Sequence, residues 1–129
     1  MSPPPATLEH ARHGDHVVVT LRGELDVFNA ADMTAAIEAA VPSDAHGAVI
    51  DLSGVGFLDS TAIRRLFALT GRLGERRQRV HVVSPEGSTV LRTLELVEFS
   101  RAAPMHDTLA DALEQLEQRD AQSGRPRSG

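Results

Sequence analysis

Three polar residues, Asp59, Ser60 and Thr61, stand between an apolar run with the pattern of a strand and an apolar run with the pattern of a helix. The N-terminus of a helix leaves about four backbone N–H groups unpaired and carries a partial positive charge, so it favours an anion placed there. A phosphoryl group on Ser60 would meet that condition. Asp, Ser and Thr are also preferred N-cap residues, worth about 1 kcal/mol, so one of the three is expected to cap the helix whatever the function. One cap needs one side chain, which leaves the other two available.

The segment GELD places another carboxylate, that of Asp26, after an earlier predicted strand. Because the loops at the carboxyl ends of parallel strands face one crevice, we expect Asp26 to lie with Asp59, Ser60 and Thr61 in one candidate site. Asp26, Asp51 and Asp59 also suggest a Mg²⁺-dependent phosphoryl-transfer site like that of receiver domains. Those domains use a lysine, which this chain lacks, and Asp51 lies inside a predicted strand, where an edge or loop-bonding role is expected.

The composition narrows the class of protein. A chain of 129 residues with four Phe and no Trp or Tyr predicts one domain with an aliphatic core. The absence of Cys excludes disulfides and thiolate metal sites. All thirteen basic residues are arginine, which excludes mechanisms that need a lysine, and the chain has no G-x-x-x-x-G-K phosphate loop. A net charge of -5 argues against direct binding of nucleic acid and favours a protein partner.

The histidines do not form a metal-binding pattern. They are scattered over predicted loops and strand ends without a paired helical spacing, so neither a metal nor a cofactor is expected. The six are His10, His13, His16, His46, His81 and His106. In a strand whose Val80 and Val82 point inward, His81 is expected to be exposed. No apolar run approaches the roughly 20 residues that cross a bilayer, and no signal peptide is recognisable, so a soluble cytoplasmic protein without a membrane span is expected.

The apolar pattern predicts the elements that position the candidate site. Residues 6–26 predict a hairpin, and residues 27–42 a helix with Phe28 and Ile37 among its periodic apolar positions. Residues 47–52 predict a buried strand and residues 60 to about 72 a helix. Residues 78–84 predict another strand, followed by a helix that begins near Pro85. Leu109, Leu113 and Leu116 then predict a last helix, with Asp107 as its N-cap.

This order predicts an α/β fold. Strands that alternate with helices give a mixed, mainly parallel sheet of four to five strands, with an N-terminal antiparallel hairpin and about four helices. Residues 1–4 are expected to be flexible, residues 5–118 to form the domain, and residues 119–129 to form a disordered tail. Arg65, Arg72 and Arg76 line one stripe of a predicted helix. The stripe predicts either a solvated face or a surface that pairs with an acidic partner in a salt-sensitive way.

Several segments together resemble the STAS domain of anti-sigma factor antagonists, over about residues 5–118. The family has Asp-Ser-Ser/Thr-Gly-Leu between a strand and a helix, where this chain has Asp59-Ser60-Thr61-Ala62-Ile63. The other segments that carry the resemblance are LRGELD at 21–26, AVIDLSGVGFLDS at 48–60 and VHVVSPEGSTVLRTLELVEF at 80–99.

The resemblance implies a bacterial protein that is not an enzyme and that acts as a switch in the regulation of transcription. Its partner would be an anti-sigma factor that is also an ATP-dependent serine kinase, and the phosphorylated residue would be Ser60. Asp26 would belong to the partner-facing surface, together with Asp59, Thr61 and the two arginines Arg64 and Arg65. The unmodified protein would bind the anti-sigma factor and free its sigma factor. Phosphate adds about -1.5 to -2 charge beside the aspartates and would oppose docking.

Two alternatives remain open at this stage. The first is a STAS interaction subunit that is not phosphorylated, in a stress-sensing or lipid-transport assembly. Ala62 in place of the family's glycine and Arg64 in place of a small residue would favour it if they block the kinase. The second is a small nucleotide-binding or phosphoryl-transfer protein that uses Asp26 and Asp59. We also expect a phosphatase that removes the phosphate and so resets the switch. The protein itself is expected to be a monomer or weak dimer.

Overall fold

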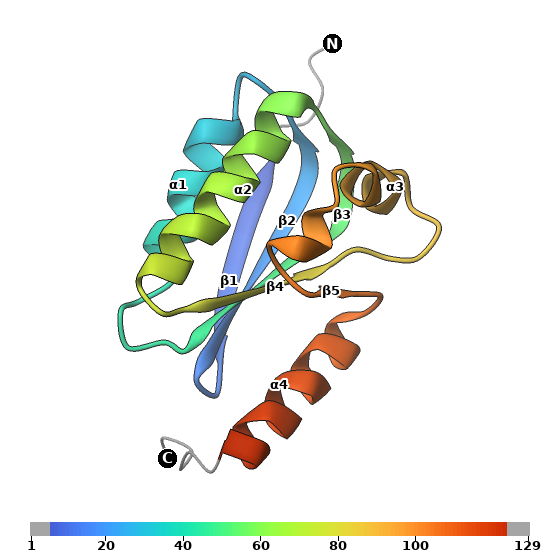
Figure 1. The fold of residues 1–129 in the computed structure, drawn as a ribbon. Helices are drawn as coiled ribbons and strands as arrows, with labels where there is room; N and C mark the ends of the chain where they lie inside the picture. The colour runs from blue at the N-terminus through green and yellow to red at the C-terminus, as the bar shows by residue number, and fades with distance from the viewer. Residues whose placement is uncertain (1–5, 124–129) are drawn as a thin grey trace.

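In the computed structural model, which describes residues 6–123, a five-stranded sheet carries helices on both faces (Figure 1). The strands lie in the order β1-β2-β3-β4-β5; β1 runs antiparallel to β2, and the remaining pairs are parallel. The predicted mixed α/β sheet with an N-terminal antiparallel pair and four helices is therefore confirmed. The elements are β1 Thr7–His13, β2 His16–Leu25, α1 Ala30–Ala40, β3 Gly47–Leu58, α2 Ser60–Glu75, β4 Arg79–Val83, α3 Thr89–Leu96, the 3-10 helix η1 Phe99–Arg101, β5 Met105–His106 and α4 Leu109–Ser123.

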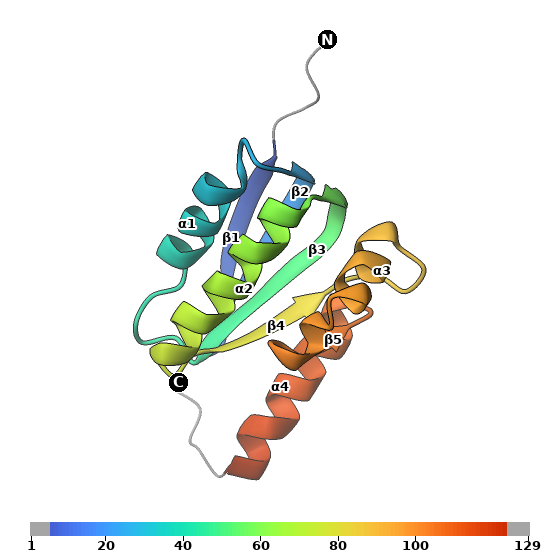
Figure 2. The ribbon, with the colours of Figure 1, turned by 45° about the horizontal axis from the view of Figure 1, so that its top comes forward.

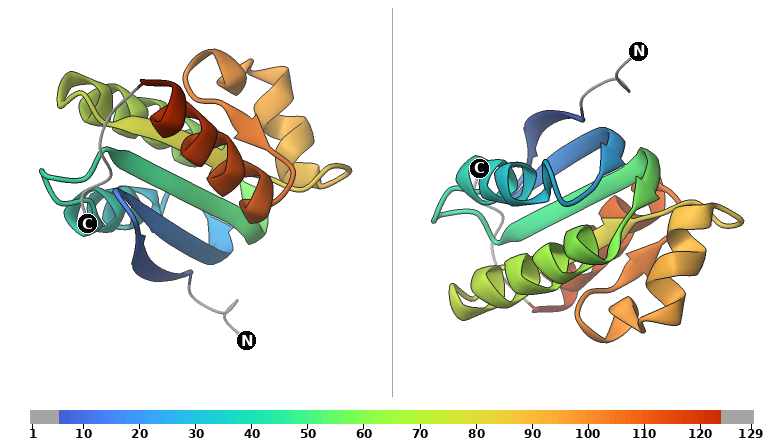
Figure 3. Two further views of the ribbon diagram at one scale, coloured as in Figure 1. Left: turned by 90° about the horizontal axis from the view of Figure 1, so that it is seen from below. Right: turned by 90° about the horizontal axis from the view of Figure 1, so that it is seen from above.

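The two faces of the sheet are covered unequally. Helices α1 and α2 lie side by side over one face (Figure 2), and α3 contributes Val90 and Leu94 to the same core. Helix α4 crosses the opposite face (Figure 3), where Ala112 and Leu116 pack against Val49. No helix in the described part of the chain has the length and apolar content needed to cross a membrane.

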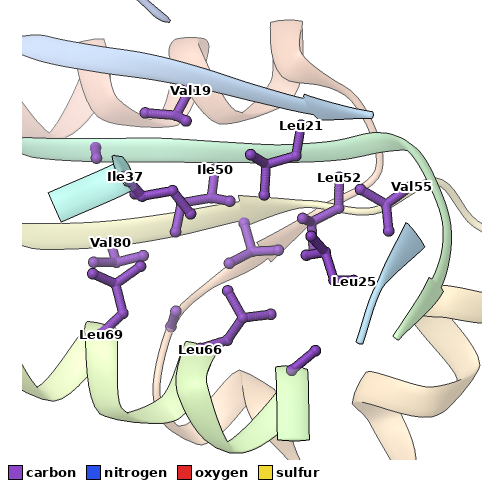
Figure 4. Packing of buried hydrophobic residues seen from close by; sticks show 14 of the residues in the cluster. Val19, Leu21, Leu25, Ile37, Ile50, Leu52, Val55, Leu66, Leu69 and Val80 are labelled. Carbon is purple, nitrogen blue, oxygen red and sulfur yellow. The ribbon is translucent and has the colours of Figure 1, made fainter. Parts of the chain in front are cut away.

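The main core is aliphatic, as the composition predicts. Leu21 and Ile50 point from neighbouring strands toward Leu66 and Leu69 of α2 (Figure 4), and all four are at most 2% exposed. Fully burying a side chain of this size stabilises a fold by about 1.5–3 kcal/mol, so this layer anchors α2 firmly to the sheet. The position of the N-terminus of α2, where the candidate site lies, is fixed by this packing.

The expectation that His81 is exposed was wrong. Val80 and Val82 do face the main core, but His81 is 0% exposed because α4 covers the other face of β4. Its Nδ1 lies 2.9 Å from Nε2 of His106 on β5. Burial, followed by the charge of His106, lowers the pKa of His81 from 6.5 to about 4. Both faces of a parallel sheet are normally buried, so a polar residue that alternates with valines in such a strand can still be internal.

Strand β3 is longer than predicted. It continues beyond Leu52, through Gly54 and Gly56 to Leu58, because it pairs there with the second half of β2. The pairing contains irregularities between Thr20 and Arg22 and between Gly23 and Glu24. Such bulges bend strands and increase their twist. The extension brings the ends of β2 and β3 level with each other, with Leu25 opposite Leu58.

Three helices begin later than the sequence predicts. Helix α1 begins at Ala30, which leaves Phe28 outside the helix and 91% exposed. Helix α3 begins at Thr89 with Ser88 as its N-cap, so Pro85 lies in the preceding turn. Asp107 is not the cap of α4; the hydroxyl of Thr108 accepts from Asp111 N, while Asp107 accepts from Glu86 N. In each case, turn residues ahead of the helix take part in their own hydrogen bonds.

The arginine stripe joins the two helices of the main layer. Nε of Arg72 donates to Glu38 of α1 at 2.7 Å, and Arg76 lies 3.8 Å from the same carboxylate and donates to the carbonyl of Val41. Arg65 alone of the predicted stripe is exposed without an ion pair among residues 6–123. Two of the three arginines of the stripe therefore bind groups of the same chain, and the stripe is not a free basic surface.

Only part of the expected domain boundaries falls within the described residues. Helix α4 continues to Ser123, beyond the domain end expected at residue 118, so the beginning of the expected disordered tail is helical. Residues 1–4 and 124–129, expected to be flexible and disordered, lie outside the described residues. The domain contains every element of the sheet within residues 7–106.

Candidate functional site

The candidate site lies at the edge of the sheet where β2 and β3 end and α1 and α2 begin (Figure 1). Asp26 follows β2 directly and Asp59 follows β3 directly. The backbone N–H of Asp59 donates to the carbonyl of Leu25 at 3.2 Å, which holds the two strand ends together. The structure thus brings Asp26, Asp59, Ser60 and Thr61 to one edge, as the meeting of parallel strand ends predicts.

Asp59 is the N-cap of α2 and also fixes the neighbouring loop. Its Oδ1 accepts from the N–H of Ala62 at 2.8 Å, and its Oδ2 accepts from the N–H of Val27 at 2.8 Å. One half-buried carboxylate therefore joins the start of the helix to the loop between β2 and α1. A carboxylate is a strong acceptor for backbone N–H groups at a helix N-terminus, and Asp59 is the residue placed to cap α2 because Ser60 and Thr61 already lie inside the helix.

Asp26 shapes the loop from within. Its Oδ1 accepts from the N–H groups of Phe28 and Asn29, at 2.9 and 3.2 Å. Asn29 completes the turn, because its Oδ1 accepts from Asp26 N at 3.0 Å and its Nδ2 donates to the carbonyl of Glu24 at 2.8 Å. Asn29 was not among the predicted site residues, although Asp and Asn three positions apart around two apolar residues is a turn signal.

Ser60 is the first residue of α2 and is exposed, while Thr61 is half-buried. Neither hydroxyl makes a hydrogen bond to the chain within residues 6–123. The backbone N–H groups at this end are only partly used, since Ala62 N binds the carboxylate of Asp59 and Ile63 N its carbonyl. Ser60 is therefore an accessible hydroxyl beside a helix N-terminus, and it does not contribute to capping.

Exposed apolar and basic side chains occur on the segments next to Ser60. Val27 and Phe28 are 58% and 91% exposed in the loop that Asp59 holds, and Phe57, two residues before Asp59, is 46% exposed. Arg64 and Arg65 are exposed on α2 and form no ion pair within the described residues. The edge thus combines an accessible hydroxyl, two carboxylates that accept from backbone N–H groups, and apolar side chains that are open to solvent.

The described residues offer no metal site at this edge. No group of three or more His, Asp or Glu side chains is suitably placed for a metal ion anywhere in residues 6–123. Asp51 accepts from the N–H and hydroxyl of Ser53, at 2.9 and 2.6 Å; both residues lie within β3, so the bond that was expected to reach a loop stays inside the strand. The carboxylates of Asp26 and Asp59 are turned toward backbone N–H groups. This geometry does not support the alternative of a Mg²⁺-dependent phosphoryl-transfer site.

Comparison with known proteins identifies the family. A family model described as the STAS domain matches residues 7–112. An anti-sigma-F factor antagonist of Mycobacterium tuberculosis, RsfB, is 32% identical over 112 residues, which cover 87% of this chain and 90% of RsfB. A crystal structure of an anti-sigma factor antagonist from Mycobacterium paratuberculosis is 32% identical, with a TM-score of 0.77 over 88% of this chain and 95% of that one.

A more distant structure supports the fold alone. SpoIIAA, described as a Bacillus cell fate determinant in the phosphorylated form, is 18% identical with a TM-score of 0.63, over 85% of this chain and 99% of its own. The family-model match and the two relatives at 32% identity cover most of the chain, including the whole of the candidate site. The chain therefore belongs to the STAS domain family and, within it, to the anti-sigma factor antagonists.

Proposed function

We propose that this protein binds an anti-sigma factor and so releases the sigma factor, and that phosphorylation of Ser60 ends this activity. The observation that carries the proposal is the state of Ser60. It is an exposed hydroxyl at the N-terminus of α2, and it is released from capping because Asp59 performs that role. Members of this family are regulators and not enzymes. In this proposal the protein is the substrate of another protein's kinase.

The effect of a phosphate follows from the charges already present. It would add about -1.5 to -2 units of charge next to Asp59, whose carboxylate is held in place by two backbone N–H groups. Arg64 lies four residues after Ser60, one turn along the same side of α2, so its free guanidinium is within the reach of a phosphate. The phosphorylated edge would present a hydrated dianion where the unmodified edge presents a small neutral hydroxyl. Docking that desolvates this edge would then be strongly opposed.

The finer identity of the partners belongs to the same proposal. The anti-sigma factor would also be the ATP-dependent serine kinase, and a phosphatase would restore the unmodified hydroxyl. We place this activity in the cytoplasm, where sigma factors direct transcription. The net charge of -5 favours these protein partners over direct contact with nucleic acid. The protein would act as a monomer or weak dimer.

A non-phosphorylated interaction subunit is the second candidate, and Ala62 bears on it. Alanine replaces the glycine of the family at this position, but Ala62 is 1% exposed and lies on the buried side of α2. Its methyl group therefore adds no bulk to the surface that a kinase would approach. Arg64 is exposed and remains the one feature of the site that favours this second candidate.

The test is phosphate transfer by a candidate anti-sigma kinase. The full chain is incubated with the kinase and ATP, and any phosphate is located by mass spectrometry. We expect phosphate on Ser60, loss of transfer in Ser60→Ala, and at least tenfold weaker binding of the kinase by Ser60→Asp. Ser100→Asp is the matched control, because Ser100 is an exposed serine of η1, and it should bind like the wild type. Phosphate on Ser60→Ala, or equal binding by both aspartate variants, would contradict the proposal.

A further inference from the structure

Large apolar side chains are exposed on the segments that lead into α1 and α2, next in sequence to Asp26 and Asp59. Phe28 is 91% exposed, Val27 58% and Phe57 46%. Elsewhere in residues 6–123, the large hydrophobic side chains with comparable exposure are Leu96 and Val97, at the end of α3. Scattered apolar residues are normal on a protein surface, but several gathered at one edge indicate a place where another molecule binds.

The loop that carries Val27 and Phe28 is held in one conformation. The N–H of Val27 donates to Asp59, and that of Phe28 donates to Asp26. Asn29 joins the far end of the same turn to Glu24. The exposure of Phe28 is therefore built into a hydrogen-bonded turn, and the backbone that carries the ring is held in place before any partner arrives. Such preorganisation lowers the entropy that binding would otherwise cost.

The same hydrogen bonds change the role of the two aspartates. Each carboxylate is already an acceptor for two backbone N–H groups, so part of its capacity to accept hydrogen bonds is used to hold the turn. The side chains that face solvent freely are those of Val27 and Phe28. Asp26 and Asp59 are thus positioning residues, and the residues that they position are apolar.

We propose that Phe28 is the anchor of the protein interface and inserts its ring into an apolar hollow on the anti-sigma factor, with Val27 next to it in the same loop. This inference rests on the proposed function and names the contact that makes it work. The anti-sigma factor is favoured as the binding partner because the loop of Val27 and Phe28 is hydrogen-bonded to Asp59, the residue before Ser60. A phosphate on Ser60 would therefore hold water close to the place where the anti-sigma factor has to exclude it. A second copy of the chain is disfavoured as the binding partner, because two chains that each carry a net charge of -5 repel each other.

The experiment compares variants of the full chain by surface plasmon resonance against an anti-sigma factor. Phe28→Ala should raise Kd about 30-fold, the effect typical of a buried aromatic hot spot, and Val27→Ser should raise it less. Leu96→Ala is the matched control, since Leu96 is 80% exposed on a different element, and it should change Kd less than threefold. The melting temperature should be the same in all three variants, because each replaced side chain is mostly in solvent.

The outcomes separate this inference from the proposed function. If the wild-type chain binds no anti-sigma factor and Ser60 receives no phosphate, the proposed function is wrong. If the wild type binds and Ser60→Asp does not, but Phe28→Ala binds like the wild type, the function stands and the anchor is wrong. Concentration-dependent dimers of the wild type that Phe28→Ala abolishes, seen by sedimentation without an effect on anti-sigma binding, would assign the patch to a second copy instead and overturn the inference.

Discussion

Replacement of Asp59 by alanine should destabilise the fold through two separate hydrogen bonds. The bond to Ala62 N is an N-cap contact, worth about 1 kcal/mol. The bond to Val27 N has an ionised acceptor, and such bonds contribute about 1.5–3 kcal/mol, with the lower value appropriate for a half-buried group. Asp59→Ala should therefore lower the free energy of unfolding by about 2–3 kcal/mol. In a domain of this size, that loss corresponds to a fall of about 8–12 °C in Tm.

The assay is urea unfolding followed by circular dichroism, with thermal unfolding as a second measurement. Asp59→Asn keeps one acceptor oxygen and should lose about half of the stability that Asp59→Ala loses. Asp44→Ala is the control, because Asp44 is 75% exposed and its contact with Arg12 is a surface ion pair at 3.3 Å, worth less than about 1 kcal/mol. If Asp59→Ala unfolds within about 0.5 kcal/mol of the wild type, the carboxylate does not join the loop to the helix in solution, and the presentation of Phe28 loses its basis.

Three further predictions follow from single positions. Ser60→Ala should change the free energy of unfolding by less than about 0.5 kcal/mol in urea titrations, since its hydroxyl caps nothing; a loss above 1 kcal/mol would make it a structural residue. Because the pKa of His81 is about 4 in the folded protein and 6.5 in its ordinary state, the unfolded chain binds the proton first as the pH falls. Stability should drop by about 3 kcal/mol between pH 6.5 and 4, and His81→Gln should flatten that slope in pH-dependent unfolding; an unchanged slope would exclude His81 as its source. Gly47→Ala should cost about 1–3 kcal/mol, because its Cβ would overlap the backbone of Arg79, whereas Gly56→Ala, with open space around it, should be nearly neutral in the same titration.

The sequence predicts the site better than it predicts the surface around it. Asp26, Asp59 and Ser60 come together because parallel strands end at a common edge, and this follows from the order of the elements without any detail of packing. The choice of Asp59 as the cap was left open by residue type alone. It depends on a carboxylate that reaches a second N–H, that of Val27, in a loop distant in sequence. Long-range contacts of this kind have no local signal.

The misplacement of Phe28 and that of His81 have opposite physical causes. Phe28 fits the apolar period of the following helix, but the turn formed by Asp26 and Asn29 delays the start of that helix to Ala30 and leaves the ring in solvent. His81 interrupts an apolar alternation and was assigned to solvent, but α4 buries its face of the sheet. Leu113 and Leu116 gave a signal for that burial, because the apolar stripe of their helix had to pack against the second face of the sheet.

The separation of capping by Asp59 from the modification proposed at Ser60 would let one edge be both rigid and switchable. Because Asp59 caps α2, a change at Ser60 does not remove a hydrogen bond on which the helix depends. A phosphate there would lie beside the partly unpaired N–H groups of the first turn, which favour an anion, and beside Asp59, which opposes it, so the two effects on folding stability partly cancel. The charge would instead weaken the binding of the partner protein that removes water from Phe28. A switch arranged in this way changes affinity for the partner while the phosphorylated protein remains folded, and thus ready to be restored by removal of the phosphate.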